Sequence, residues 1–164
     1  IILFAAIAVA LAVGLTRDPN AIPSALIDSP LPEFSLEQLD ADAPEMSRAD
    51  VVGPPFILNV FGSWCAACVV EHPYLMTLKQ QNIRIIGLNW RDTRADASAW
   101  LARHGDPYTT ILFDQHSDLA IELGVTGAPE TFLVAGDGTI LLKHVGAMDS
   151  KVWNDVFLPA MEGS

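Results

Sequence analysis

Positive charge is scarce in this 164-residue sequence. Nine lysines and arginines stand against 20 aspartates and glutamates, which gives a formal net charge of -11 and a pI of about 4.5. A chain this acidic repels phosphate backbones and the anionic cytoplasmic surface of a membrane. Nucleic acid is therefore not an expected partner.

Cysteine is scarce as well, because Cys65 and Cys68 in the stretch FGSWCAAC are the only two in the chain. A structural zinc site needs four ligands, and one C-x-x-C pair supplies two. The other candidate ligands are the histidines His72, His104, His116 and His144. They are scattered over separate segments, so no metal site is expected. A purely structural disulfide would close a very small loop and would stabilise the fold little.

Charge is absent from the first fifteen residues, IILFAAIAVALAVGL. Such a run is typical of a membrane anchor or an export segment. As a helix it would span about 22 Å, which is less than the roughly 30 Å hydrocarbon core, so we expect the segment to begin upstream of Ile1. Small residues at 8–10 and 12–14 leave cleavage by a signal peptidase open, but we favour a retained transmembrane anchor over residues 1–15. Acidic residues follow Arg17, and the positive-inside rule then puts the domain outside the cytoplasm.

Prolines and polar residues fill positions 16–32, a composition typical of an extended tether. We therefore expect the globular domain to cover residues 33–164. Hydrophobic residues make up 51% of the chain, which is enough for one core of ordinary size.

The hydrophobic pattern predicts an α/β domain. Residues 56–61 and 83–90 are apolar runs typical of buried strands, and the helical spacing over 66–82 completes a β-α-β unit. Further elements are expected after this unit: helices over 91–105 and 117–124, a hairpin over 131–146, and a C-terminal helix over 149–161. The expected architecture is a mixed sheet with helices on both faces.

The place of the cysteine pair favours redox chemistry over the metal and structural alternatives. The pair begins the helix of the β-α-β unit, where the helix N-terminus stabilises a thiolate. Cys65, at the helix start, is expected to be exposed and to attack, whereas Cys68, one turn further on, is expected to be shielded and to resolve. Trp64 is expected to flank the sulfur of Cys65.

Two longer stretches carry a family pattern: FILNVFGSWCAACVVEHPYL over 56–75 and GVTGAPETFLVAGDGTI over 124–140. They resemble the CcmG/DsbE family, the thioredoxin-like thiol:disulfide reductases of cytochrome c maturation. The resemblance extends from about Pro32 to Pro159 and includes the N-terminal anchor. It implies a thioredoxin-like fold and a redox-active Cys65–Cys68 disulfide, with no other cofactor.

The resemblance also implies roles for single residues. Cys65 matches the nucleophile of the family, and Cys68 matches the resolving thiol. Pro129 matches the cis-proline that lies against the active-site disulfide and exposes the preceding backbone to a substrate strand.

Three polar residues match positions near the active site. By resemblance, Glu71 and Glu130 are acidic residues close to the cysteines, where a negative charge raises the pKa of a thiol. Judged from the residues alone, Glu71 also fits a solvated charge on a helix face, and Glu130 fits a charge at a strand edge. Asn59 stands where ordinary thioredoxins carry a buried aspartate.

The function implied by the resemblance is a single-pass protein of the bacterial inner membrane with its soluble domain in the periplasm. It would reduce apocytochrome c or a haem-ligation component, and a membrane thiol reductase would supply its electrons. Three alternatives stay open: a reductase for other periplasmic clients, a Cu(I) metallochaperone that uses both cysteines and a histidine, and a module that binds extended peptides without turnover.

Overall fold

A computed structural model describes residues 26–163 of the chain. The expected membrane anchor and most of the expected tether lie outside these residues. Within residues 26–163, no helix is both long and apolar enough to cross a bilayer.

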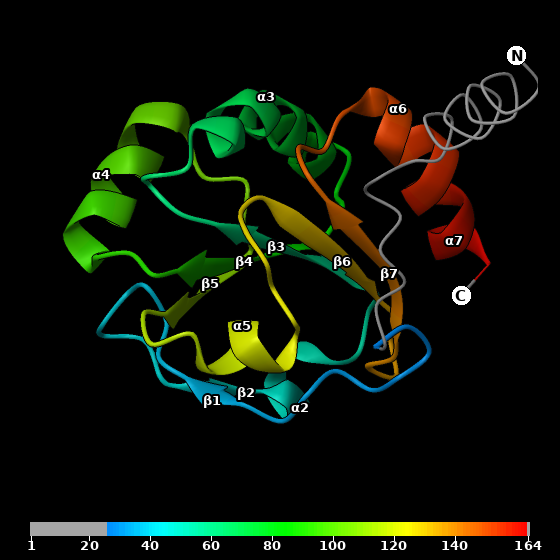
Figure 1. Cartoon of the computed structure of the whole chain (residues 1–164), viewed down its shortest axis with the longest axis horizontal. Helices are drawn as coiled ribbons and strands as arrows, with labels where there is room; N and C mark the ends of the chain where they lie inside the picture. Colours follow the sequence, from blue (N-terminus) through cyan, green and yellow to red (C-terminus); the bar gives the residue numbers. More distant parts are fainter. Residues whose placement is uncertain (1–25, 164) are drawn as a thin grey trace, which may run out of the picture.

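Among the described residues, five strands form the central sheet in the order β5-β4-β3-β6-β7 (Figure 1). These strands are β3 (Phe56–Phe61), β4 (Ile85–Trp90), β5 (Thr110–Asp114), β6 (Glu130–Val134) and β7 (Ile140–Val145). β3 pairs in parallel with β4, and β4 pairs in parallel with β5. β6 runs antiparallel to both β3 and β7. The expected mixed sheet, the β-α-β unit and the hairpin are confirmed.

The strand β5 is the main element that the sequence pattern does not predict. Its apolar core is only the short run Ile111–Phe113, too brief to indicate a strand by itself. The structure stabilises it from both sides, because β4 pairs with one edge and the N-terminal segment hydrogen-bonds to the other. On that second edge, Leu39 N–H donates to the carbonyl of Ile111 at 2.9 Å.

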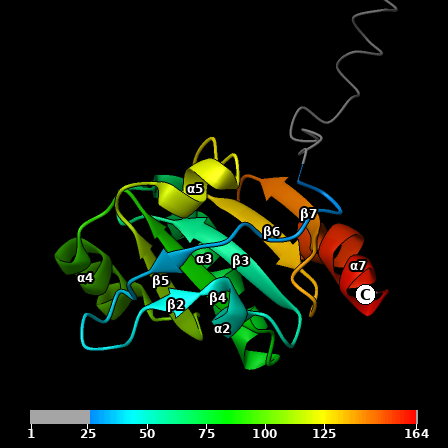
Figure 2. The ribbon, with the colours of Figure 1, turned by 90° about the horizontal axis from the view of Figure 1, so that it is seen from below.

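Helices cover both faces of the sheet (Figures 1 and 2). One face carries α3 (Ala66–Gln80), α4 (Arg94–His104), α6 (Ser150–Val152), the π-helical turn η1 (Trp153–Phe157) and α7 (Leu158–Glu162). The other face carries α2 (Arg48–Val51), α5 (Asp118–Glu122) and the small hairpin of β1 (Ser35–Leu36) and β2 (Met46–Ser47). Each expected helix is therefore present, and the last one is divided by a π-helical turn.

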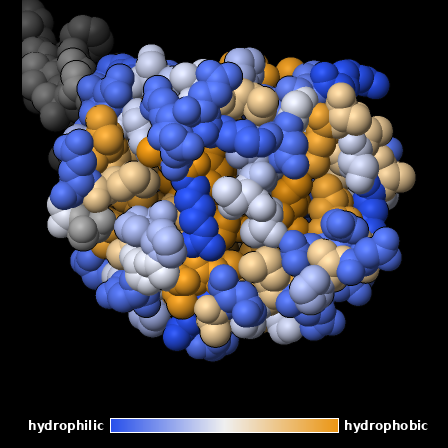
Figure 3. Space-filling model, turned by 180° about the vertical axis from the view of Figure 1, so that it is seen from behind, coloured by the Kyte–Doolittle hydropathy of each residue, from blue (hydrophilic) through white to orange (hydrophobic). Residues whose placement is uncertain are grey.

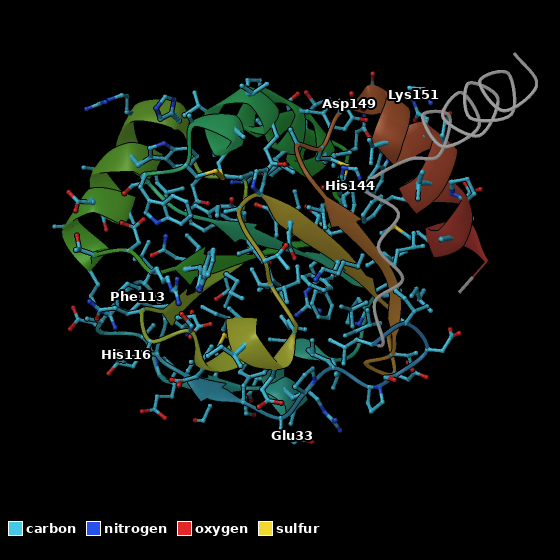
Figure 4. All side chains as sticks on the ribbon, in the orientation of Figure 1. Glu33, Phe113, His116, His144, Asp149 and Lys151 are labelled. Atoms are coloured by element: carbon cyan, nitrogen blue, oxygen red, sulfur yellow. A yellow bond between two sulfur atoms is a disulfide. The ribbon has the colours of Figure 1, made fainter. Side chains whose placement is uncertain are left out.

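The alternation of β3 divides the core into two layers (Figure 4). Leu58 and Val60 belong to the apolar cluster that includes residues of α5, whereas Ile57 and Phe61 belong to the cluster that includes residues of α3. Successive side chains of a strand point to opposite faces, so Asn59 shares the α3 face with Ile57 and Phe61. A polar side chain at the centre of β3 is thus placed under the cysteine-bearing helix.

Packing begins before the expected domain boundary at Glu33. The Asp28 N–H donates to the carbonyl of Ile140 at 2.9 Å, and the Leu31 N–H donates to the carbonyl of Gly138 at 2.7 Å. Leu31 is 1% exposed and belongs to the α5-side cluster. The expected boundary between tether and domain is therefore too late in the sequence. Proline-rich backbone is extended, and an extended segment can lie along the edge of a hairpin without needing an N–H at every residue.

The surface mixes hydrophilic and hydrophobic residues, as the view from behind shows (Figure 3). Among the described residues, the large hydrophobic side chains that are exposed are Trp64, Val69, Val70, Ile121 and Val156. Trp64, Val69 and Val70 flank the cysteine pair in sequence, which directs attention to the start of α3.

Candidate functional site

Cys65 and Cys68 form a disulfide at the start of α3, with their Cα atoms 5.3 Å apart; it is the yellow bond near α3 in Figure 4. Cys65 is the N-cap of the helix, and the Cys68 N–H donates to its sulfur at 3.1 Å. The free amides and the dipole at a helix N-terminus favour negative charge. A thiolate formed on Cys65 by reduction is therefore stabilised at this position.

The expected difference in exposure between the two cysteines is wrong for this disulfide-bonded state. Cys65 is 2% exposed and Cys68 is 1% exposed. The bond to Cys68 holds the Cys65 sulfur against the first turn of α3, and Ala128 of the facing loop packs against the cluster that contains both cysteines. What separates the two thiols is their position relative to the helix start, since Cys65 caps it and Cys68 lies inside it.

Trp64 immediately precedes Cys65, and 52% of its surface is exposed. Its Nε1–H donates to the carbonyl of Trp90 at 3.2 Å, and the two indole rings meet edge to face at 5.8 Å. Trp64 also lines a groove of about 410 Å³ together with Arg91 and Asp92. The residue before Cys65 is thus a half-exposed ring that is held against Trp90 and lines a groove.

The peptide bond between Ala128 and Pro129 is cis, as the resemblance implies. Pro129 is buried, and its carbonyl accepts a hydrogen bond from the Gly146 N–H at 2.9 Å. Ala128 packs against the apolar cluster that includes Cys65 and Cys68, so the loop of the cis-proline belongs to the surroundings of the cysteine pair.

Glu71 is buried on the α3 face, at 1% exposure. Its Oε1 accepts from Asn59 Nδ2 at 2.9 Å, and its Oε2 accepts from the Met148 N–H at 2.8 Å. Burial raises the pKa of Glu71 to about 7, although the hydrogen bonds from Met148 and Asn59 oppose this rise. The alternative of a solvated helix-face charge is therefore wrong for Glu71.

Asn59 is the centre of this buried network. Besides Glu71, its Nδ2 donates to Thr131 Oγ1 at 3.0 Å, and its Oδ1 accepts from the Tyr108 hydroxyl at 2.9 Å. Burial, together with the charge of Glu71, raises the pKa of Tyr108 well above its ordinary value. Sequence reasoning misses Thr131 and Tyr108, because each looks like an ordinary strand or core residue until the fold brings it to Asn59.

Glu130 is also fully buried, which excludes the strand-edge alternative, but it lies on the other face of the sheet. Its Oε1 accepts from the N–H groups of Thr126 at 2.7 Å and of Gly127 at 3.0 Å, and Lys143 Nζ lies 3.0 Å from its Oε2. Neighbouring strand residues point to opposite faces, and Thr131 faces Asn59. Glu130 therefore holds the loop that carries the cis-proline, whereas Glu71 lies on the face of the cysteine helix.

Comparison with known proteins places this arrangement in a family. The Redoxin family model matches residues 27–156. The thiol:disulfide interchange protein DsbE of Allochromatium vinosum is 44% identical over 158 residues, which cover 96% of this chain and 87% of the relative. DsbE of Escherichia coli K12 is 44% identical over 169 residues, which cover 99% of this chain and 91% of the relative.

The chain belongs to the DsbE family of thiol:disulfide interchange proteins. With its C-x-x-C pair, this DsbE-family chain is a thiol-disulfide oxidoreductase.

Solved structures of other proteins superpose on the fold of this chain. A DsbE-like protein of Chlorobium tepidum superposes with a TM-score of 0.70 at 24% identity, covering 80% of this chain and 95% of the other. A secreted thiol-disulfide isomerase of Corynebacterium glutamicum gives a TM-score of 0.71 at 23% identity, covering 89% and 96%. The DsbE-family chain therefore has the thioredoxin-like fold.

The candidate metal ligands of this DsbE-family chain do not gather around the cysteine pair within the described residues. His72 is 2% exposed; its Nε2 lies 2.9 Å from the carbonyl oxygen of Gly105, and its ring packs edge-on against Trp100. Within residues 26–163, no three side chains of His, Cys, Asp or Glu come together as a group that could hold a metal ion.

In the reduced DsbE-family chain, Cys65 is expected to react with iodoacetamide before Cys68, because only Cys65 caps the helix and receives the Cys68 amide. Partial alkylation followed by peptide mass spectrometry measures the order, and Cys65→Ser and Cys68→Ser give the rate of each remaining thiol. Faster labelling at Cys68 would reverse the assignment of the two roles.

Proposed function

We propose that this chain is a membrane-tethered reductase of the bacterial periplasm that reduces the disulfide of apocytochrome c or of a haem-ligation component. The observation that carries the proposal is the capped cysteine: in a DsbE-family chain, the Cys65 sulfur receives the Cys68 amide at a helix start. Haem attachment needs both thiols of a C-x-x-C-H motif free, and an oxidising compartment closes them. A dedicated reductant resolves this conflict.

The reaction we propose is a two-step exchange. The Cys65 thiolate attacks one sulfur of the client disulfide, a mixed disulfide forms, and the other client sulfur leaves as a thiolate. Cys68 loses its proton, and its thiolate attacks the Cys65 sulfur, which releases the second client thiolate and restores the Cys65–Cys68 disulfide. Two electrons pass to the client, and a dithiol of a membrane thiol reductase returns two electrons to this chain.

Glu71 tunes the reducing power in this proposal. It lies one turn after Cys68 on the same helix, and near neutral pH it is partly ionised because its pKa is about 7. A buried negative charge on this face disfavours a thiolate and raises the thiol pKa. A dithiol whose reduced form is less stabilised is the stronger reductant, so ionised Glu71 makes the pair more reducing.

The N-terminal segment supports the membrane part of the proposal. Residues 1–15 are uncharged and apolar, and acidic residues follow Arg17. We propose that this segment anchors the chain in the inner membrane, with the acidic domain on the periplasmic side.

Client capture tests the proposal. In Cys68→Ser the mixed disulfide at Cys65 lacks a resolving thiol, so it is expected to persist. Membranes from cells that make this variant, run on non-reducing gels, are expected to show an adduct that contains apocytochrome c or a haem-ligation component. The matched control is Cys65→Ser/Cys68→Ser, which is expected to show none.

The alternatives give different results in the same experiment. Adducts spread over many unrelated proteins would favour a reductase for other clients. Binding of Cu(I) by the reduced chain, with no adduct in the variant, would favour a metallochaperone. Either pattern would contradict the proposed function.

A further inference from the structure

A short turn precedes the nucleophile. The Cys65 N–H donates to the carbonyl of Gly62 at 3.0 Å, so residues 62–65 form a closed turn with Ser63 and Trp64 at its two central positions. We call residues 62–64 the pre-cysteine turn. Any movement of this turn moves the amide and the sulfur of Cys65.

Asp92, just after β4, holds the pre-cysteine turn. Its Oδ2 accepts from the Ser63 N–H at 2.6 Å, and its Oδ1 accepts from the Ser63 hydroxyl at 2.8 Å. The carboxylate is itself fixed by Asn89 Nδ2 at 3.0 Å and by the Thr93 N–H at 2.8 Å. Asp92 is 6% exposed, so it joins the ends of β3 and β4 from a nearly buried position.

The pre-cysteine turn has a second attachment through Trp64. The indole donates to the Trp90 carbonyl, two residues before Asp92. The ring folds back so closely that a Cβ added to Gly62 would lie 2.5 Å from Trp64 Nε1. A residue with a side chain at position 62 is therefore incompatible with this position of Trp64, so the second attachment of the turn depends on Gly62.

The charge of Asp92 suits this role. Burial alone would raise the pKa of its carboxyl, but the hydrogen bonds from Ser63, Asn89 and Thr93 outweigh burial and lower the pKa below its ordinary value. The group is therefore ionised at neutral pH, and charge-assisted hydrogen bonds are shorter and stronger than neutral ones.

We propose that Asp92 is a positioning residue for thiol-disulfide exchange, which acts through Ser63 to hold the turn that sets the attack geometry of Cys65. The inference rests on the role of Cys65 as nucleophile in the proposed function. It assigns no contact between Asp92 and a client, and the bonds made and broken are those of the exchange described above.

The test compares rates with a small disulfide, so that no protein client is needed. Reduced wild type, Asp92→Asn, Ser63→Ala and the double variant are mixed with oxidised glutathione, and the limiting rate is taken at a pH where the thiolate is complete. The matched control is Asp96→Asn, which removes an exposed carboxylate that lines the same groove and bonds to Thr93, not to Ser63.

Asp92→Asn is expected to lower the limiting rate about tenfold, because small misplacements of a reacting atom are costly. Ser63→Ala, which keeps the backbone hydrogen bond, is expected to lower it less. The double variant is expected to be no slower than Asp92→Asn, since two residues that act as one unit are not additive. Asp96→Asn is expected to stay within about twofold of wild type, because it alters the bond to the Thr93 hydroxyl and leaves the Thr93 and Ser63 hydrogen bonds to Asp92 in place.

Two results would overturn the inference. A wild-type limiting rate in folded Asp92→Asn, even with a lower melting temperature, would leave Asp92 with a purely structural role. Additive losses in the double variant would show that Asp92 does not act through Ser63. Cys65→Ser is run alongside: if it still reacts, the nucleophile assignment itself fails, which is distinguishable from failure of the positioning role.

Discussion

Replacing Cys65 with serine is expected to abolish thiol:disulfide interchange completely. The hydroxyl that replaces the thiol at the helix start is not a nucleophile toward disulfides, and Cys68 lies inside the first turn, where it does not cap the helix. Reduced protein mixed with oxidised glutathione should release no glutathione thiol within the time that wild type needs to become fully oxidised, which releases two equivalents.

The matched variant for this experiment is Cys68→Ser, which keeps the attacking thiol. It is expected to release one equivalent of glutathione thiol in a single burst and then to stop as a mixed disulfide at Cys65. Mass spectrometry should find one glutathione attached. A burst from Cys65→Ser of the size seen in Cys68→Ser would show that either cysteine can attack.

The stability of the domain is expected to fall as the pH rises through neutrality, because of Glu71. Its folded pKa is about 7 and its ordinary value is 4.5. Between these values the unfolded chain has lost the proton that the folded chain keeps, so the unfolded state binds fewer protons and the free energy of unfolding decreases with pH. The full pKa shift of Glu71 corresponds to a decrease of about 3 kcal/mol in the free energy of unfolding, which is complete above pH 7.

Urea unfolding of the oxidised protein between pH 5 and 8 measures the slope of the free energy of unfolding against pH. Glu71→Gln is expected to remove most of it. At pH 5 the variant is expected to be less stable than wild type by about 1–3 kcal/mol, since the glutamine amide cannot accept from the Met148 N–H while its oxygen bonds to Asn59. Glu122→Gln, at an exposed position of α5, serves as the control and should keep the wild-type slope. An unchanged slope in Glu71→Gln would show that another group titrates.

Local pattern made several parts of the fold predictable. The buried strands β3 and β4, the helix between them and the C-terminal hairpin each leave a strong signal in a short window of sequence, either a continuous apolar run or a turn with two glycines. β5 leaves a weak signal, because it becomes a strand through pairing on both edges. The packing of Leu31 could not be predicted either, because nothing in a proline-rich segment indicates that it lies along the β6–β7 hairpin.

The residues around the cysteines also differ in whether they could be predicted from local sequence. The sequence by itself determined the C-x-x-C pair and its place at a helix start, because these depend on neighbours in the chain. The cis bond at Pro129 followed only from the family resemblance of the GAPET stretch. It did not separate Glu71 from Glu130. Helix α3 directs the Glu71 carboxylate to Asn59 of β3, whereas the alternation of β6 turns the Glu130 carboxylate to the other face of the sheet, against the loop of the cis-proline.

Tertiary structure alone decided the contacts that depend on separate segments meeting. Asp92 reaches Ser63 because parallel strands end at the same edge of the sheet, and Tyr108 reaches Asn59 because the chain after α4 returns over the same face. The burial that raises the pKa of Glu71 likewise needs the loop of Met148 to cover it. A sequence specifies which groups are available near the cysteines, and long-range packing sets their distances and their charge.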